Sequence, residues 1–406
     1  MSEAGKSKLH TVQTNWDEIE QKIREHRLKR LKIIALIVGI CAAVGIFYYV
    51  FMQYKSYKDY TVVDTVVRAD TMATHFCEYK GNILKYSNDG ASYTNAKNEL
   101  IWNQTFNMQN PMVSICDTYV AFADRGGKEI YVLDTSGLQG TVKVNMPIAK
   151  MEIASQGTVA VMTEEAGTSY LSLYNKEGEL LAEGAIHVET GGVPLDIAIA
   201  PNGENLGVAV LDISTGKANT TVYFYNFGAA GQNEVDHIVG TYSYEDAVIP
   251  DIAYVSNDRM LAFADHAVYS FAGSDAPKED GNLQVAEEIM SIFYDNDYFG
   301  LVSTDGEDES SRNIKIYSSN CKEVETIHTE MSFVDVHFLD NHEICLRNEQ
   351  QCSIYTLGGR RKFQYDFESS VYEILHTGGF RNYVFILDGK TEQARLKLFG
   401  DAGDKE

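Results

Sequence analysis

One strand-like pattern returns eight times along the sequence and limits the fold more than any other feature. Each copy is a short alternating apolar stretch that ends in an aromatic residue or leucine and runs into a polar or glycine-containing turn. The residues that align at the ends of the copies are Tyr86, Leu133, Tyr174, Tyr225, Phe271, Tyr317, Tyr355 and Phe399. Successive copies lie 38 to 51 residues apart and average about 45. Alternation indicates half-buried β-strands, and a period near 45 residues is typical of propeller blades.

The rest of each repeat supports this interpretation. Most copies are preceded by a second apolar run, such as TYVAFAD, GTVAVMT or NLGVAVLD. The last unit has strand-like stretches at 371–375, 382–387 and 396–399 but no outer strand, and the alternating stretch at 61–68 can supply it. Such pairing removes both open sheet edges. We therefore predict an all-β fold, a β-propeller of eight four-stranded blades, with seven blades as the alternative.

A run of twenty residues without a charge, Ile33–Met52, precedes the repeats. At about 1.5 Å per helical residue it spans the hydrocarbon core of a bilayer. Four basic residues lie within 27–32, whereas only Lys55 and Lys58 follow closely on the other side. The positive-inside rule then places the N-terminus in the cytoplasm and the repeats outside. A cleaved signal peptide is the rival interpretation, but its apolar region is shorter and a small-residue cleavage site should follow.

The sequence thus predicts five successive segments. They are a cytoplasmic tail with a short amphipathic helix (1–32), a transmembrane helix (33–52), a linker (53–60), an extracytoplasmic propeller (61–400) and a disordered C-terminal tail (401–406). In the tail, Thr14 or Asn15 can cap a helix, and its basic half can lie against anionic lipid. A stripe of small residues, Ala35, Gly39 and Ala43, gives the membrane helix a surface for a homodimer, although such residues are common in single spans.

Charge and cysteine usage exclude several classes of protein. The sequence holds 34 Lys and Arg against 58 Asp and Glu, a net charge of −24, so nucleic acid is not an expected partner. Five of the six cysteines follow the apolar run, and an odd number does not suggest a disulfide framework. Cys345 and Cys352 flank an expected hairpin and can either form a cross-strand bridge or remain buried thiols.

No residue pattern specifies a catalytic, cofactor or metal site. Quinoprotein propellers place a tryptophan in nearly every blade, but the repeats contain only Trp102. There is no nucleophile elbow, phosphate loop or zinc-protease helix. The spacing of His328, His337 and His342 matches no zinc pattern, and the acidic run 305–309 lacks the alternation of a calcium loop. We expect no catalytic, cofactor-binding or metal residues on these grounds.

Several short motifs resemble those of a known family. They are PIAK at Pro147, SQG at Ser155, GGVP at Gly191, APNG at Ala200, FYNFG at Phe224, Gly231-Gln232-Asn233 and Asp236. This pattern is similar to an uncharacterised family of bacterial single-pass membrane proteins, named only as a domain of unknown function. The resemblance implies a propeller-like extracytoplasmic domain without an assigned activity. The blade pattern is also distantly similar to WD-repeat and quinoprotein propellers.

These observations favour binding over catalysis. A propeller exposes broad loop faces on a rigid scaffold, which suits recognition of a partner. We expect a module of the cell membrane that binds or scaffolds a protein or cell-envelope ligand outside the cytoplasm. The alternative is a cell-surface glycan hydrolase or lyase that uses carboxylates at the central face of the propeller.

Overall fold

The computed structural model describes residues 16–69, 74–187, 191–214, 216–305 and 308–398. The chain forms two compact units, Met1–Lys55 and Ser56–Glu406. The first unit contains one helix, α1 (Trp16–Tyr54), so the expected tail helix and membrane helix are continuous. Its segment Glu20–Met52 is a candidate membrane span by length and composition, a test that a signal sequence also passes. The expected caps Thr14 and Asn15 and the expected tail 401–406 lie outside the described residues.

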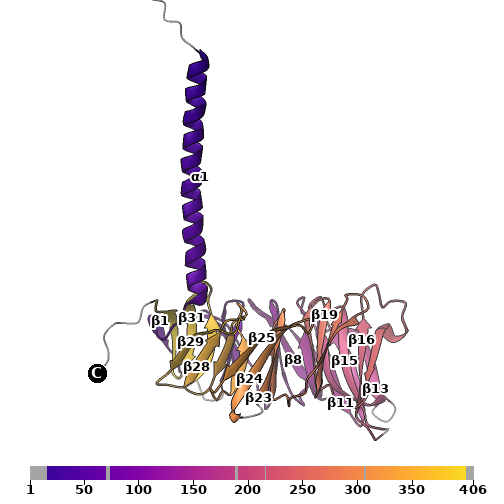
Figure 1. The fold of residues 1–406 in the computed structure, drawn as a ribbon. Coiled ribbons are helices and arrows are strands. Elements are labelled where there is room, and N and C mark those ends of the chain that lie inside the picture. Colours follow the sequence, from indigo (N-terminus) through magenta and orange to yellow (C-terminus); the bar gives the residue numbers. More distant parts are fainter. Residues whose placement is uncertain (1–15, 70–73, 188–190, 215, 306–307, 399–406) are drawn as a thin grey trace, which may run out of the picture. The chain divides into compact units, whose positions relative to one another are not determined.

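The second unit consists of four-stranded antiparallel sheets, eight in the described residues, arranged as successive blades of a ring (Figure 1). Blade 1 comprises β2 (His75–Tyr79), β3 (Asn82–Ser87), β4 (Gly90–Thr94) and β5 (Leu100–Thr105). Blade 2 comprises β6 (Pro111–Cys116), β7 (Tyr119–Asp124), β8 (Glu129–Asp134) and β9 (Gly137–Lys143). Blade 3 comprises β10 (Ile148–Ile153), β11 (Val159–Glu165), β12 (Thr168–Tyr174) and β13 (Leu180–His187). Blade 4 comprises β14 (Val193–Ile199), β15 (Asn205–Asp212), β16 (Asn219–Asn226) and β17 (Ile238–Tyr244), with a short 3-10 turn η1 (Val235–His237) before β17.

The remaining blades repeat this order. Blade 5 comprises β18 (Asp251–Ser256), β19 (Arg259–Phe263), β20 (Ala267–Ala272) and β21 (Lys278–Gln284). Blade 6 comprises β22 (Ser291–Tyr294), β23 (Tyr298–Asp305), β24 (Asp308–Ser318) and β25 (Glu323–Thr329). Blade 7 comprises β26 (Asp335–Phe338), β27 (Ile344–Arg347), β28 (Gln351–Tyr355) and β29 (Arg361–Asp366). Blade 8 comprises β30 (Val371–His376), β31 (Asn382–Leu387), β32 (Lys390–Leu396) and, as its outer strand, β1 (Tyr60–Val67).

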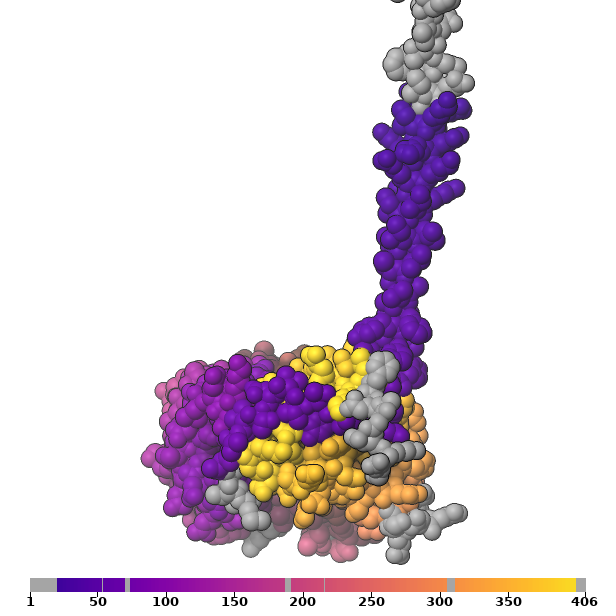
Figure 2. Space-filling view, turned by 90° about the vertical axis from the view of Figure 1, so that its left-hand side faces the viewer, coloured from indigo at the N-terminus to yellow at the C-terminus, as the bar shows by residue number. Residues whose placement is uncertain are grey.

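The ring is closed by the pairing of its two ends. β1 runs antiparallel to β32, from Tyr60 opposite Leu396 to Val67 opposite Lys390. Figure 2 shows the indigo N-terminal residues of the propeller lying against the yellow C-terminal residues. The predicted propeller of eight four-stranded blades with this closure is confirmed, and the seven-bladed alternative is wrong.

The repeated end residue of the sequence pattern marks a bulge between the third and fourth strands. The register shifts at Leu133, Tyr174, Tyr225, Phe271, Tyr317 and Tyr355 in blades 2 to 7. In blade 1 the shift falls at Thr94, so the alignment of Tyr86, which lies in the second strand β3, was wrong. The third strand of the last blade is β32, upstream of the expected 396–399 stretch, and Phe399 lies outside the described residues. The sequence pattern does not predict β4 and β32, because β4 is only five residues long and β32 (KTEQARL) is largely polar.

The hydrophobic core is divided into clusters between neighbouring blades rather than gathered in one centre. One cluster joins blades 3 and 4 through residues such as Leu171 and Leu206. Another joins blades 7 and 8 through residues such as Phe363 and Phe385. Because each blade buries both faces against its neighbours, second strands such as β7 (YVAFAD) are apolar nearly throughout. This packing holds the loops at each face of the ring on a rigid frame.

Candidate functional site

The first strand of each blade is its innermost strand. β10 contacts β6 and β14, β14 contacts β18, β22 contacts β26, and β2 contacts β30. Strand directions alternate within a blade, so the ring has two faces. We call the face with the connections between blades, such as residues 285–290 and 330–334, the connector face. We call the face with the turns between first and second and between third and fourth strands, such as residues 154–158 and 356–360, the attachment face.

Charged side chains meet where the first strands of blades 3, 4 and 5 lie next to one another. Lys150 Nζ on β10 lies 2.7 Å from Asp196 Oδ1 on β14. The backbone N–H of Ile252 on β18 donates to Asp196 Oδ2 at 3.0 Å. Glu152 Oε2, two residues along β10 from Lys150, accepts a hydrogen bond from Ser114 Oγ on β6 at 2.8 Å. We call Lys150, Glu152, Asp196 and Asp251 the axial cluster; its contacts link blades 2 to 5.

Burial and an excess of carboxylates over cations raise the proton affinity of the axial cluster. Burial raises the pKa of Glu152 to about 7; the charges of Asp196 and Asp251 add to the rise, while Ser114 and Lys150 oppose it. Burial also raises the pKa of Asp251 to about 6, again with a contribution from Asp196. These two carboxyl groups therefore gain and lose protons close to neutral pH, as a general acid or base must do.

A second polar group lies on the inner strands of blades 7 and 8. His337 Nδ1 is 2.8 Å from Asp335 Oδ2, and its Nε2 is 3.4 Å from Glu373 Oε1 on β30. Arg347 Nε lies 3.2 Å from Asp335 Oδ2. Burial alone would lower the pKa of His337, but Asp335 and Glu373 outweigh it and raise that pKa. Burial alone would raise the pKa of Asp335, but His337 and Arg347 outweigh it and lower that pKa.

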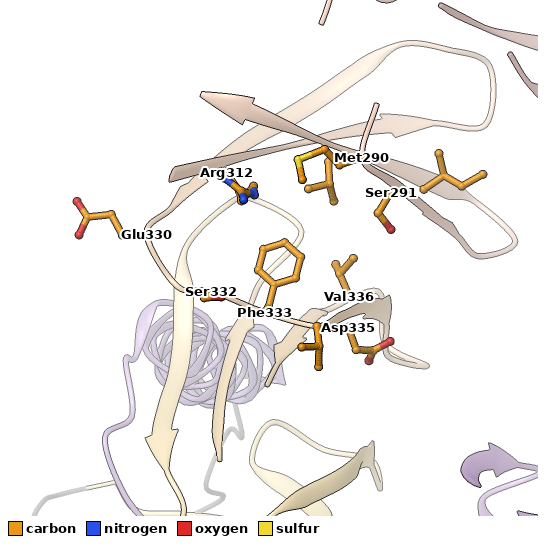
Figure 3. A pocket seen from close by; sticks show the side chains of 11 residues that line it. Met290, Ser291, Arg312, Glu330, Ser332, Phe333, Asp335 and Val336 are labelled. Carbon is orange, nitrogen blue, oxygen red and sulfur yellow. The ribbon is translucent and has the colours of Figure 1, made fainter. Parts of the chain in front are cut away.

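A groove on the connector face leads to this second group. It has a volume of about 610 Å³ and lies between blades 6 and 7 (Figure 3). Its lining residues are Met290, Ser291, Ile292, Val302, Arg312, Glu330, Ser332, Phe333, Val334, Asp335 and Val336. In Figure 3 the ring of Phe333 projects into the groove, whereas Glu330 points away from it. Met290 and Val334 are 52% and 75% exposed, so apolar groups are open to a partner here.

The chain joins the propeller at the attachment face. Ser56 Oγ donates to the Arg361 carbonyl at 2.6 Å, and the N–H of Tyr57 donates to the Lys362 carbonyl at 2.7 Å. Tyr57 forms a parallel bridge with Phe363 of β29, and its side chain is 3% exposed within the cluster between blades 7 and 8. Part of the expected linker, 53–60, is therefore fixed to the outer strand of blade 7.

The structure separates the residues that the sequence singled out. Of the three histidines, only His337 belongs to the second polar group. His342, in a turn of blade 7, lies 2.6 Å from Asp295, in a turn of blade 6. His328 lies on the outer strand β25. Across the described part of the chain, no three His, Cys, Asp or Glu side chains form a group that could hold a metal ion. Trp102 packs in the core between blades 1 and 2. Part of the acidic run, residues 306–307, lies outside the described residues.

The two cysteines of blade 7 are free thiols in the structure. Cys345 lies opposite Ile354, and Cys352 lies opposite Arg347, so their positions are offset by two residues across the β27–β28 pair. Both side chains are fully buried, and burial raises both thiol pKa values. Of the two alternatives that the sequence left open, the structure has the buried thiols, because the hairpin register does not place the two cysteines opposite each other.

The axial cluster was not predicted from the sequence. Its signal is a charged residue inside an otherwise apolar first strand, as in IAKMEI of β10 and VPLDIAI of β14. Such a residue is costly to bury unless it has partners, so each one indicates a polar neighbour on another strand. The neighbour cannot be identified before the blades are assembled.

Comparisons with known proteins agree with the fold. A sequence model described as a family of unknown function, DUF5711, matches residues 53–396. A search of curated proteins finds no match. The C-terminal WD40 domain of Sif2 is similar with a TM-score of 0.56 and 10% identity, covering 84% of this chain and 99% of that one. Sqt1 from Chaetomium thermophilum has a TM-score of 0.52 and 12% identity, with 84% and 99% covered. BamB from Moraxella catarrhalis has a TM-score of 0.47 and 12% identity, with 83% and 100% covered. At these identities the likeness concerns the fold alone.

Proposed function

We propose a function for this chain, which belongs to the DUF5711 family, whose description assigns no activity. The protein acts as a membrane-anchored, extracytoplasmic binding or scaffold module. Its ligand is a protein or a polymer of the cell envelope. The propeller supplies the rigid scaffold, and α1 supplies the candidate anchor.

One observation carries this proposal: the chain is fixed at one face of the ring, and a groove with exposed apolar side chains lies on the other. α1 ends at Tyr54 and the hydrogen-bonded contacts of the propeller begin at Ser56, so the attachment face is only a few residues of chain from the anchor. The groove and the exposed Val334 lie on the opposite, connector face, where a partner can reach them. Exposed apolar groups inside a concavity are typical of partner-binding surfaces.

The test is crosslinking of the full chain in its native cells, followed by purification and identification of captured proteins. Val334→Asp places a charge in the groove, and Ile213→Asp is the matched control, since Ile213 is 65% exposed in a turn on the same face. We expect one protein to be captured near one-to-one, lost with Val334→Asp and retained with Ile213→Asp. Equal capture by both variants would contradict a role for the groove. Protease added to wall-stripped cells should cleave the propeller; full protection would contradict the extracytoplasmic placement.

The axial cluster favours a second candidate, a glycan hydrolase or lyase. Glu152 has its pKa raised to about 7, which suits a general acid at neutral pH. The purified full chain would be incubated with cell-wall polysaccharide from its host and the release of reducing ends measured. Turnover that disappears in Glu152→Gln would support this candidate. Absence of turnover by the wild-type chain would leave the binding function as the better account.

A further inference from the structure

A cleft lies at the side of the propeller, between blades 3 and 4. Its volume is about 730 Å³. Leu171, Leu173 and Leu206 form a floor that is less than 10% exposed. Tyr225 and Phe227 form one wall, with their rings stacked at a centroid distance of 6.3 Å. A hollow of this size, with leucine side chains at its floor and two aromatic rings at one wall, is suited to hold a large side chain.

The register of the outer strands explains why this hollow exists. In blade 7, Phe363 lies opposite Ile354, one residue before the bulge at Tyr355. In blade 3 the equivalent place, opposite Leu173 and one residue before the bulge at Tyr174, is held by Ala182.

The next position on the same side shows the same difference. It is Tyr365 in blade 7 and Gly184 in blade 3, and a Cβ atom built on Gly184 would have nothing within 4 Å. Small residues in blade 3 thus leave open the space that aromatic rings fill in blade 7.

Blade 7 also shows what the space beside an outer strand, between two neighbouring blades, can hold. The extended segment Ser56–Lys58 lies along the outer edge of β29, donates the N–H of Tyr57 to the Lys362 carbonyl and buries the Tyr57 ring beside Phe363. β13 presents the same kind of outer edge in blade 3, and within the described residues no strand pairs with it. Unpaired strand edges bind extended peptides through backbone hydrogen bonds.

The wall of the cleft in blade 4 is held in a constrained conformation. Asp236 and His237 have φ values of 55° and 61°, the left-handed region that costs energy for residues other than glycine. His237 Nδ1 lies 3.1 Å from the Gly231 carbonyl, and the N–H of Gly231 donates to Asn226 Oδ1 at 3.2 Å. The loop is therefore held in place by its own contacts.

The charges beside the cleft select the partner. Glu183 and Asp236 line it and are exposed, so the rim of the hollow is acidic. The Glu183 side chain lies on the opposite face of β13 from Ala182, where it accepts a hydrogen bond from Ser172 Oγ at 3.4 Å. The seated segment in blade 7 has Lys58 directly after Tyr57. A lysine next to an inserted aromatic ring would lie near this rim and be attracted to it.

We propose that the outer edge of β13 and the adjoining cleft bind an extended segment of a partner protein, with a lysine-flanked aromatic side chain inserted between blades 3 and 4. The segment lies along the outer edge of blade 3, in the way that Tyr57 forms a parallel bridge with Phe363 at the edge of blade 7. For the existence of a partner this inference rests on the proposed function, but the site itself is independent of the groove on the connector face.

The test measures binding of a fluorescent peptide to the full chain in lipid nanodiscs. The probe has the sequence of residues 53–60, QYKSYKDY, and the control peptide carries Tyr54→Ala and Tyr57→Ala, because each of these tyrosines precedes a lysine. Ala182→Phe fills the cleft with the residue found in blade 7, and Gly184→Tyr does so from the next position. Leu180→Phe is the matched control, because Leu180 lies on the same strand, is 52% exposed and is not part of the cleft lining.

We expect saturable binding of the probe. Binding should weaken by about tenfold or more with Ala182→Phe, with Gly184→Tyr and with the control peptide, whereas Leu180→Phe should change it by no more than about twofold. Hydrogen exchange should slow in β13 when the peptide binds. Both cleft variants must show the wild-type melting curve, so that a loss is not due to misfolding; if one of them fails this check, the other decides. No saturable binding, binding unaffected by the cleft variants, or protection of β29 instead of β13 would overturn the inference.

The two proposals fail separately. If the peptide does not bind but Val334→Asp still abolishes capture of a partner, only the site between blades 3 and 4 is wrong. If the peptide binds at β13 but no partner is captured from cells, the proposed cellular function is wrong while the peptide site stands.

Discussion

Lowering the pH from 8 to 5 should stabilise the propeller, and Glu152 should supply much of the effect. The pKa of Glu152 is raised from 4.5 to about 7 in the folded protein. A carboxyl group whose pKa is raised by folding adds stability below its unfolded pKa, and this stability is lost as the pH rises through the folded value. The rise in the pKa of Glu152 corresponds to a proton affinity about 300-fold higher in the folded than in the unfolded state, or about 3 kcal/mol of stability. Asp251 acts in the same direction with a smaller effect in this range, since its pKa is about 6.

The expected change in melting temperature follows from the size of the unit, residues 56–406. With an unfolding entropy of about 0.7 kcal/mol/K for such a length, 3 kcal/mol corresponds to about 4 °C. The assay is differential scanning fluorimetry of the full chain in detergent between pH 5 and pH 8.

The variant Glu152→Gln isolates this contribution, because glutamine keeps an acceptor for Ser114 but does not titrate. We expect its Tm to exceed that of the wild type by about 4 °C at pH 8 and to match it at pH 5. Glu165→Gln, an exposed change in the same blade, should follow the wild type throughout. If the curves of Glu152→Gln and the wild type ran parallel from pH 5 to pH 8, the assignment of the pH dependence to the axial cluster would be refuted.

Three further outcomes can be measured with the same protein. Lys362→Met leaves the buried partner Glu343 without its cation and should cost about 3 kcal/mol, whereas adding Glu343→Leu should restore most of the Tm; a double variant no better than the single one would contradict this. Gly231→Ala should speed proteolysis of the loop before β17, because a Cβ there would lie 1.9 Å from a backbone oxygen, while Gly358→Ala, with nothing within 4 Å, should be cut like the wild type. The two buried cysteines of β27 and β28 should react with maleimide only after denaturation, and rapid labelling of the native chain would count against their burial.

The fold was largely predictable because each blade repeats one local pattern. Second strands such as β7 and β15 are apolar except at their ends, and β1 carries the alternation of a closing strand. Prediction failed where a strand lacks that pattern. β32 was placed too late in the chain because it contains polar residues, of which Glu392 is buried and accepts a hydrogen bond from Tyr60. That partner is 332 residues away, so no local signal could reveal it.

The sites were much less predictable than the fold. Lys150 and Asp196 are 46 residues apart in sequence and meet only because neighbouring blades place their first strands together. The cleft between blades 3 and 4 depends on the bulge register, which places Ala182 where blade 7 has Phe363. A one-residue error in such a register turns a side chain to the opposite face.

The sequence by itself determined the propeller fold, the closure by the N-terminal strand and the presence of one long apolar helix, and it favoured eight blades over seven. These follow from periodicity and from the length of an uncharged run, which are properties of neighbouring residues. The axial cluster, the groove at Val334 and the cleft at Ala182 were decided only by the tertiary structure. Each is formed by strands or loops of different blades, and packing alone determines which residues of separate blades come into contact.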